Sequence, residues 1–311
     1  MDSIISFEDV SKVYRRGFRA TPVHAVSNFT AKVYSNRITG FVGPNGAGKT
    51  TSIKMLMGLV KATSGKISIG GCDVSDPQAR KGVAYVSEQP YFYRHLSVSE
   101  ALRFSCALLK IPSNFAMDEV KRVLEIVELS GKEKMRIHDM SKGMMQRLNM
   151  ANGLLGDPGL LVLDEPMSGL DPPARRLFRS LFTKLGKAGK TVFFSTHVLE
   201  DIEMVCDDVI VLDKGMVRYS GKVSELLARG YLGTELIIAT LPPEIRAGFS
   251  ERGWSISDTK DGQYMIFVPD GDGLRDCQKI LSEYEIFCTS VIKRTMPLET
   301  LLYGSAMEER S

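Results

Sequence analysis

The sequence has few of the features that mark extracellular or membrane-spanning chains. Its five cysteines are odd in number, are scattered along 311 residues and form no Cys-x-x-Cys pair. That distribution argues against a disulfide framework and a zinc site and favours free thiols in a reducing compartment. No apolar run approaches the roughly 18 residues of a membrane span, and the first residues lack the basic start of a secretory signal. We therefore expect a cytoplasmic protein, with any membrane contact made through a partner.

No charge of one sign dominates the chain, since 40 Lys/Arg stand against 37 Asp/Glu and the net charge is +3. This balance is too small for a protein that binds nucleic acid through bulk charge, and we expect no nucleic-acid partner. The length allows one large domain plus a small one. From residue 231 onward there are 13 acidic and 8 basic residues, so the C-terminal part is the more acidic one.

The pattern of apolar runs predicts an α/β fold up to about residue 228. Continuous apolar runs are typical of strands buried in a parallel sheet, and the segments between them have helical spacing. Residues 97–156 are predominantly helical and form a predicted helical subdomain inserted into the sheet. The expected strands are 4–7, 25–33, 38–42, 66–73 (a short pair), 82–87, 160–163, 191–195 and 209–212, and a helix is expected at 51–59.

The last 80 or so residues have a different pattern. They read as strand, helix, two strands, helix and strand, which is the β-α-β-β-α-β order of a ferredoxin-like domain. We therefore predict two domains, 1–228 and 229–311, the second of them regulatory or dimer-stabilising. The expected strands are 235–240, 255–259, 263–268 and 286–293, with a turn at Lys260-Asp261-Gly262, and the expected helices are 242–252, 273–284 and 298–303.

The strongest local signal is a glycine-rich loop between a strand and a helix, which matches Gly-x-x-x-x-Gly-Lys-[Ser/Thr]. Glycines let successive backbone N–H groups turn inward around a polyphosphate, and the following helix adds the positive end of its dipole. Lys49 would reach the β- and γ-phosphates, and Thr50 would ligate Mg²⁺. A coincidental glycine turn is disfavoured because a strand and a helix flank the loop. The candidate ATP-binding residues are Gly43, Pro44, Asn45, Gly46, Ala47, Gly48, Lys49, Thr50 and Thr51.

A pair of carboxylates, Asp164 and Glu165, follows the apolar run 160–163. Ligands of parallel sheets bind at the carboxyl ends of the strands. Asp164 would hold Mg²⁺, directly or through water, and Glu165 would orient and deprotonate an attacking water. Alone, such a pair is as well explained by a solvated strand end. Beside the phosphate loop, the catalytic interpretation is favoured.

Further motifs give the sequence a specific resemblance. Ser141-Lys142-Gly143-Met144 resembles the signature motif of the ATP-binding cassette (ABC) family, and Ser168-Gly-Leu-Asp171 is similar to its D-loop. His197 lies at the position of the family's switch histidine, and Tyr14 at that of its adenine-stacking aromatic. Tyr14 also fits a half-buried strand tyrosine. The motifs occur in the family's order and cover residues 3–225.

The resemblance implies that two such domains dimerise head to tail. Each ATP would then lie between the phosphate loop of one subunit and the signature of the other. Ser141, Lys142, Gly143 and Asp171 would contact the partner's ATP in trans. Lys49, Glu165 and His197 would be the catalytic residues.

One motif departs from the family's usual pattern. The glutamine position after the strand at 82–87 is taken by Glu88, with Gln89 next to it. We favour Glu88 as a Mg²⁺ or water ligand and keep Gln89 as the alternative. Glu88 and the Ser-Lys-Gly-Met signature resemble the drug- and polysaccharide-export sub-group. Tyr91-Phe-Tyr93, which follows, fits core packing and a partner-binding groove equally well.

The function implied by the resemblance is an ATPase subunit, with ATP and Mg²⁺ as cofactors, that powers a membrane exporter. We expect it to act as a homodimer on the cytoplasmic face of the membrane, which it would reach through a separate permease subunit. One alternative is an ABC ATPase that acts on ribosomes or DNA. Against it, the chain has a single cassette and no inserted coiled coil or zinc module. Another is an importer ATPase whose C-terminal domain senses a ligand.

Overall fold

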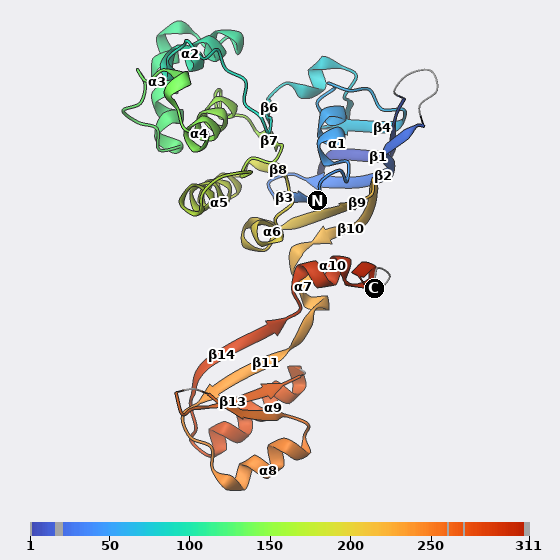
Figure 1. Ribbon diagram of the computed structural model, residues 1–311, viewed down its shortest axis with the longest axis vertical. Coiled ribbons are helices and arrows are strands. Elements are labelled where there is room, and N and C mark those ends of the chain that lie inside the picture. Colours follow the sequence, from blue (N-terminus) through green and yellow to red (C-terminus); the bar gives the residue numbers. More distant parts are fainter. Residues whose placement is uncertain (1, 16–20, 260, 270, 308–311) are drawn as a thin grey trace. The chain divides into compact units, whose positions relative to one another are not determined.

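The computed structural model describes residues 2–15, 21–259, 261–269 and 271–307, with side chains to residue 302. The chain divides into two compact units, Met1–Val223 and Ser224–Ser311. The boundary expected from the sequence, between residues 228 and 229, lies a few residues later, inside helix α7 (Val223–Arg229). Figure 1 shows the course of the chain through each unit.

A six-stranded sheet forms the centre of the first unit, in the order β10-β9-β3-β8-β7-β6. Neighbouring strands from β9 to β6 run parallel, and β10 joins the edge antiparallel to β9. Every residue of β3, β7 and β8 is buried, as expected of strands inside a parallel sheet. The strands are β3 (Ile38–Val42), β6 (Val83–Val86), β7 (Leu160–Leu163), β8 (Thr191–Thr196), β9 (Asp208–Asp213) and β10 (Met216–Lys222).

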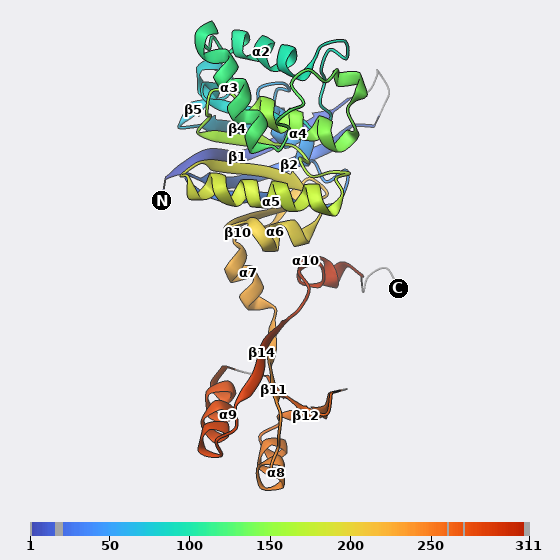
Figure 2. The ribbon, with the colours of Figure 1, turned by 90° about the vertical axis from the view of Figure 1, so that its left-hand side faces the viewer.

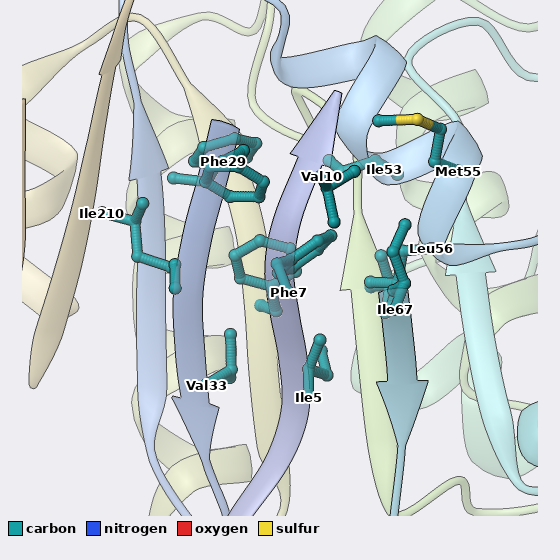
Figure 3. Packing of buried hydrophobic residues seen from close by; sticks show 14 of the residues in the cluster. Ile5, Phe7, Val10, Phe29, Val33, Ile53, Met55, Leu56, Ile67 and Ile210 are labelled. Atoms are coloured by element: carbon teal, nitrogen blue, oxygen red, sulfur yellow. The ribbon is translucent and has the colours of Figure 1, made fainter. Parts of the chain in front are cut away.

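An antiparallel sheet with the order β2-β1-β4-β5 packs on the first. Stacked or tilted aromatic rings connect the two sheets, from Phe7 and Phe29 to Phe41 and Phe193. Figure 3 shows the side chains of β1, β2, β4 and α1 that gather around Phe7 and Phe29. Burying each such ring contributes about 1.5–3 kcal/mol. The elements are β1 (Ser3–Tyr14), β2 (Val23–Tyr34), α1 (Lys49–Leu56), β4 (Ser64–Ile69) and β5 (Cys72–Asp73).

The predicted helical insertion lies between β6 and β7, and its helices group beside those strands (Figure 1). Ser97 and Glu100 form a capping box at the start of its first helix. Two further helices, α5 and α6, precede and follow β8 (Figure 2). The helices are α2 (Val98–Leu108), α3 (Ser113–Ile126), α4 (Lys142–Gly153), α5 (Pro172–Lys187) and α6 (Leu199–Val205), with short 3-10 turns at Pro77–Arg80 and Ile137–Asp139.

The second unit has the β-α-β-β-α-β element order expected from the sequence. Its antiparallel sheet has the order β12-β13-β11-β14. Helices α8 and α9 pack against it and enclose a core that contains Phe249 and Trp254. Lys260, in the predicted turn, lies outside the described residues. The elements are β11 (Tyr231–Ile238), α8 (Pro243–Glu251), β12 (Ser255–Asp258), β13 (Tyr264–Val268), α9 (Gly271–Glu283), β14 (Cys288–Thr295) and α10 (Leu298–Met307).

Candidate active site

The glycine-rich loop connects β3 to α1 and can be built only with glycine at key positions. Gly48 has a φ of 106°, and a Cβ on it would lie against the carbonyl oxygen of Ala25. The side chain of Lys49 is 6% exposed and folds back under the loop. Its ammonium donates hydrogen bonds to the carbonyls of Gly43 (2.6 Å) and Pro44 (3.3 Å). The loop therefore wraps around its own lysine.

Asp164 leaves the end of β7 directly beside the start of α1. Its carboxylate accepts hydrogen bonds from Ser195 Oγ (2.7 Å) and Thr50 Oγ1 (3.2 Å). Burial raises the pKa of Asp164, while the two hydroxyl hydrogen bonds act in the opposite direction. Thr50 and Asp164, both predicted Mg²⁺ ligands, are thus in contact. Hydroxyl and carboxylate oxygens are the hard donors that Mg²⁺ prefers, so the residues present fit the ion.

Glu165 directly follows β7 and is held there by three contacts. Its backbone N–H donates to Ser195 Oγ (2.8 Å). One carboxylate oxygen lies 3.3 Å from Lys49 Nζ, and the other lies 2.9 Å from His197 Nδ1. Its φ of 47° is left-handed, a conformation that costs a non-glycine residue about 1–2 kcal/mol. Such strain persists where the surroundings fix a residue, as happens at functional sites.

These groups line one cavity of about 400 Å³ at the carboxyl edge of the parallel sheet. Segments distant in the sequence meet there because β3, β6, β7 and β8 run parallel and end at the same edge. Three further predicted residues hold members of this lining in place. The carbonyls of Gly43 and Pro44 accept hydrogen bonds from Lys49, and Asp164 accepts one from Thr50. The cavity is lined by Ala25, Asn45, Gly46, Ala47, Gly48, Lys49, Thr50, Thr51, Glu88, Glu165, Ser168 and His197.

Glu88 lines the cavity and Gln89 does not, within the part of the chain that the structure describes. The backbone carbonyl of Gln89 instead accepts a hydrogen bond from Ser87 Oγ (2.9 Å). Of the aromatic residues that follow, Tyr91 is 91% and Tyr93 55% exposed. Core packing therefore does not explain these two side chains.

Tyr14 lies at the end of β1, where the residue is 37% exposed. The ammonium of Lys12 lies 4.9 Å from the ring centroid. Among the residues that the structure describes, Tyr14 is not part of the cavity lining, and the neighbouring segment 16–20 lies outside them. Its contact with adenine stays a prediction.

The residues expected to act in trans gather around a second cavity of about 290 Å³, which Ser141, Gly143 and Asp171 help to line. Ser141 is the N-cap of α4, and its Oγ accepts from the N–H of Met144 (3.3 Å). Asp171 is the N-cap of α5. The side chain of Lys142 lies against Gly169. The lining of this cavity shares no residue with that of the 400 Å³ cavity.

Three residues near the site were given no individual role from the sequence, although Ser168 belongs to the D-loop motif. Ser195 bridges Asp164 and Glu165, while Ala25 and Ser168 line the cavity. Ser195 lies on the buried strand β8, which ends one residue before His197. Its place in Ser195-Thr196-His197 was the available signal. The Ala25 contact depends on the pairing of distant strands, which no local pattern shows.

Comparison with known proteins identifies the family. The family described as ABC transporter matches residues 26–168. An uncharacterised ABC transporter ATP-binding protein of Nostoc sp. is 39% identical over 228 residues, covering 72% of this chain and 68% of that protein. The chain belongs to the ABC transporter ATP-binding proteins. The Nod factor export ATP-binding protein I of Cupriavidus metallidurans is 35% identical, covering 73% of this chain and 74% of that protein. It fits the drug- and polysaccharide-export sub-group indicated by the sequence.

Solved structures support the same fold class. One described as the ATP-binding subunit of an ABC transporter has a TM-score of 0.64 and 28% identity, covering 73% of this chain and 93% of that one. The prediction of an ABC-type P-loop fold is confirmed, and this ABC ATP-binding protein belongs to a family that generally hydrolyses ATP. In the described part of the chain, no helix is long and apolar enough to cross a membrane.

Proposed function

We propose that this ABC protein is the ATP-hydrolysing subunit of a membrane exporter and drives transport through a separate permease subunit on the cytoplasmic face. The observation that supports this most directly is the contact of Glu165 with both Lys49 and His197 in the 400 Å³ cavity. A general base, a phosphate-binding cation and an orienting imidazole are the groups that ATP hydrolysis needs. The similarity to a Nod factor export protein supports export as the direction.

Each residue of the cavity has a distinct task in this proposal. The loop N–H groups and Lys49 bind the β- and γ-phosphates. Glu165 accepts the proton of the attacking water, and His197 holds the carboxylate in position. Thr50, Asp164 and Glu88 would hold Mg²⁺, which supplies positive charge to the phosphate oxygens. Tyr14 would stack on adenine.

The separation of the two cavities supports a head-to-tail homodimer. Within one chain, Ser141, Gly143 and Asp171 line a different cavity from Lys49. The N-terminus of α4 is suited to an anion, since backbone N–H groups and the helix dipole point outward from it. In the dimer, the signature residues of one copy, with Lys142, would cover the γ-phosphate bound by the other.

The replacement Glu165→Gln tests this proposal. It keeps the shape of the side chain but removes the base, so hydrolysis should fall by about a thousandfold or more while ATP binding remains. Because the nucleotide is not consumed, ATP with Mg²⁺ should convert the variant to a stable dimer in size-exclusion chromatography.

The matched control is the double variant Glu165→Gln/Lys49→Ala, which should stay monomeric because it lacks the phosphate-binding cation. A Glu165→Gln protein that binds ATP but remains monomeric would contradict the dimer. Hydrolysis that survives in Glu165→Gln would contradict the role of Glu165.

A further inference from the structure

Asp201, a residue of α6 outside the cavity, is a fully buried carboxylate with 0% exposure. Burying an ionised group is costly unless it is paired. Asp201 is paired with Arg179 of α5, whose Nη2 and Nε lie 2.6 and 2.8 Å from Oδ1. Arg175 of α5 lies 3.5 Å from the other carboxylate oxygen. One carboxylate therefore holds two arginines of a neighbouring helix.

This ion-pair cluster joins the two segments that carry the catalytic residues. Helix α6 starts two residues after His197, so its position sets the position of the histidine. Arg175 also reaches the carbonyl of Met167 (3.5 Å), two residues after Glu165. Helices α5 and α6 lie side by side in both views (Figures 1 and 2). Asp201 thus connects the segment that follows Glu165 with the segment that follows His197.

The other side of α6 is fixed by close packing. A Cβ on Gly40 of β3 would overlap Ile202 and press on Cys206, so α6 touches the backbone of β3. With one side against β3 and the other bound to α5, the helix has little freedom to shift. His197, whose Nδ1 lies 2.9 Å from Glu165 Oε2, comes two residues before this restrained helix.

We propose that Asp201 is a positioning residue that keeps His197 on Glu165 by clamping α6 to α5. This inference rests on the proposed hydrolytic function. Asp201 touches no substrate; it acts through the histidine. The clamp should affect the rate of the chemical step and leave ATP binding nearly unchanged, because the phosphate loop makes no contact with Asp201.

The test is Asp201→Asn in the full chain, with kcat and KM for ATP measured beside the wild type. A small misplacement of a catalytic group lowers rates by about tenfold to 100-fold. We therefore expect kcat to fall in this range while KM changes by less than about threefold. In a His197→Ala background, Asp201→Asn should cause no further loss of kcat, because its effect passes through the histidine.

The matched control is Asp208→Asn. Asp208 is also a buried carboxylate, 2.6 Å from Arg37, but it lies at the amino end of β9, the edge of the sheet opposite the cavity. Asp208→Asn should lower thermal stability without lowering kcat. Should Asp201→Asn fail to fold by circular dichroism, Arg179→Lys carries the same expectations, since lysine keeps the charge and loses the two-pronged contact.

The possible outcomes separate the two proposals. Normal kcat in Asp201→Asn, or equal losses with and without His197, would overturn the positioning role alone. Equal losses of kcat in Asp208→Asn and Asp201→Asn would do the same, because they would reduce the effect to general stability. If Glu165→Gln does not lower the ATPase rate relative to the wild type, both the proposed function and this inference are overturned.

Discussion

The two units of the molecule handle polar groups in different ways. In the first, the parallel strands β3, β7 and β8 all end at one edge, and the residues that follow them come together. In the second, neighbouring strands run antiparallel, so their carboxyl ends alternate between opposite edges.

The difference shows how topology decides where chemistry can be assembled. A parallel sheet brings Lys49 together with Glu165 and His197, which lie more than a hundred residues later in the sequence. The second unit has a core of its own around Phe249 and Trp254, which provides stability without a comparable convergence. We therefore expect catalysis to depend on the first unit and only the assembly or its regulation to depend on the second.

The largest effect should come from substitutions at the two surfaces of the first unit that would meet ATP in the dimer, the phosphate loop and the signature motif. Lys49→Ala and Ser141→Arg should each abolish hydrolysis, the former by removing the phosphate-binding cation and the latter by filling the partner's γ-phosphate site. Mixed dimers keep one intact site, so an equal mixture should recover about a quarter of wild-type activity if the sites act independently. The measurement is the ATPase rate of the separate and the mixed proteins. Activity in purified Ser141→Arg would rule out the trans role.

A smaller effect is expected from creating a cavity in the core of the second unit. Phe249 is 1% exposed, and its ring centroid lies 5.1 Å from that of Trp254. Replacing Phe249 with alanine should lower the free energy of unfolding by about 3–5 kcal/mol. Calorimetry should show this loss in the transition of the second unit, with ATP affinity unchanged. Phe29→Ala, the same truncation in the first core, should lower both stability and ATP affinity. Equal losses of affinity in the two variants would show that the units are not independent.

The smallest effect on the active site should come from removing the second unit. Truncation after Ala228 should leave ATP affinity within about twofold of the full chain, since no residue of the second unit lines the 400 Å³ cavity in the described structure. Dimerisation or coupling to the permease should weaken. Isothermal titration and analytical ultracentrifugation measure the two properties. Loss of ATP binding by a truncated protein that is still folded would mean that the second unit contributes to the site.

The fold was predictable where the local pattern was strong. The run Leu160–Leu163 reads as a buried strand, and the structure has β7 there. Strand β10 was not anticipated, because its residues alternate between exposed and half-buried and its apolar content is low. The alternation has a physical cause, since β10 is an edge strand of its sheet and pairs there with β9 alone among the described strands.

The candidate site was predictable as a set of residues but not as an arrangement. Residues 43–51 form a recognisable loop motif, and Glu165 and His197 occur in motifs of their own. The structure places these residues together. The contacts of Ser195 and Asp201 depend on which strands and helices become neighbours, and short-range patterns carry little information about that. The position of Tyr14 relative to adenine stays open for the same reason.

Mutations of Gly40 are expected to be harmful for a purely steric reason. Gly40 lies in the middle of β3, has no functional group, and permits α6 to touch the strand. Every missense change in its codon adds a Cβ at the point where Ile202 already lies. Inactivating alleles are therefore expected at a residue that contacts neither nucleotide nor base, and compensating alleles are expected where Ile202 becomes smaller.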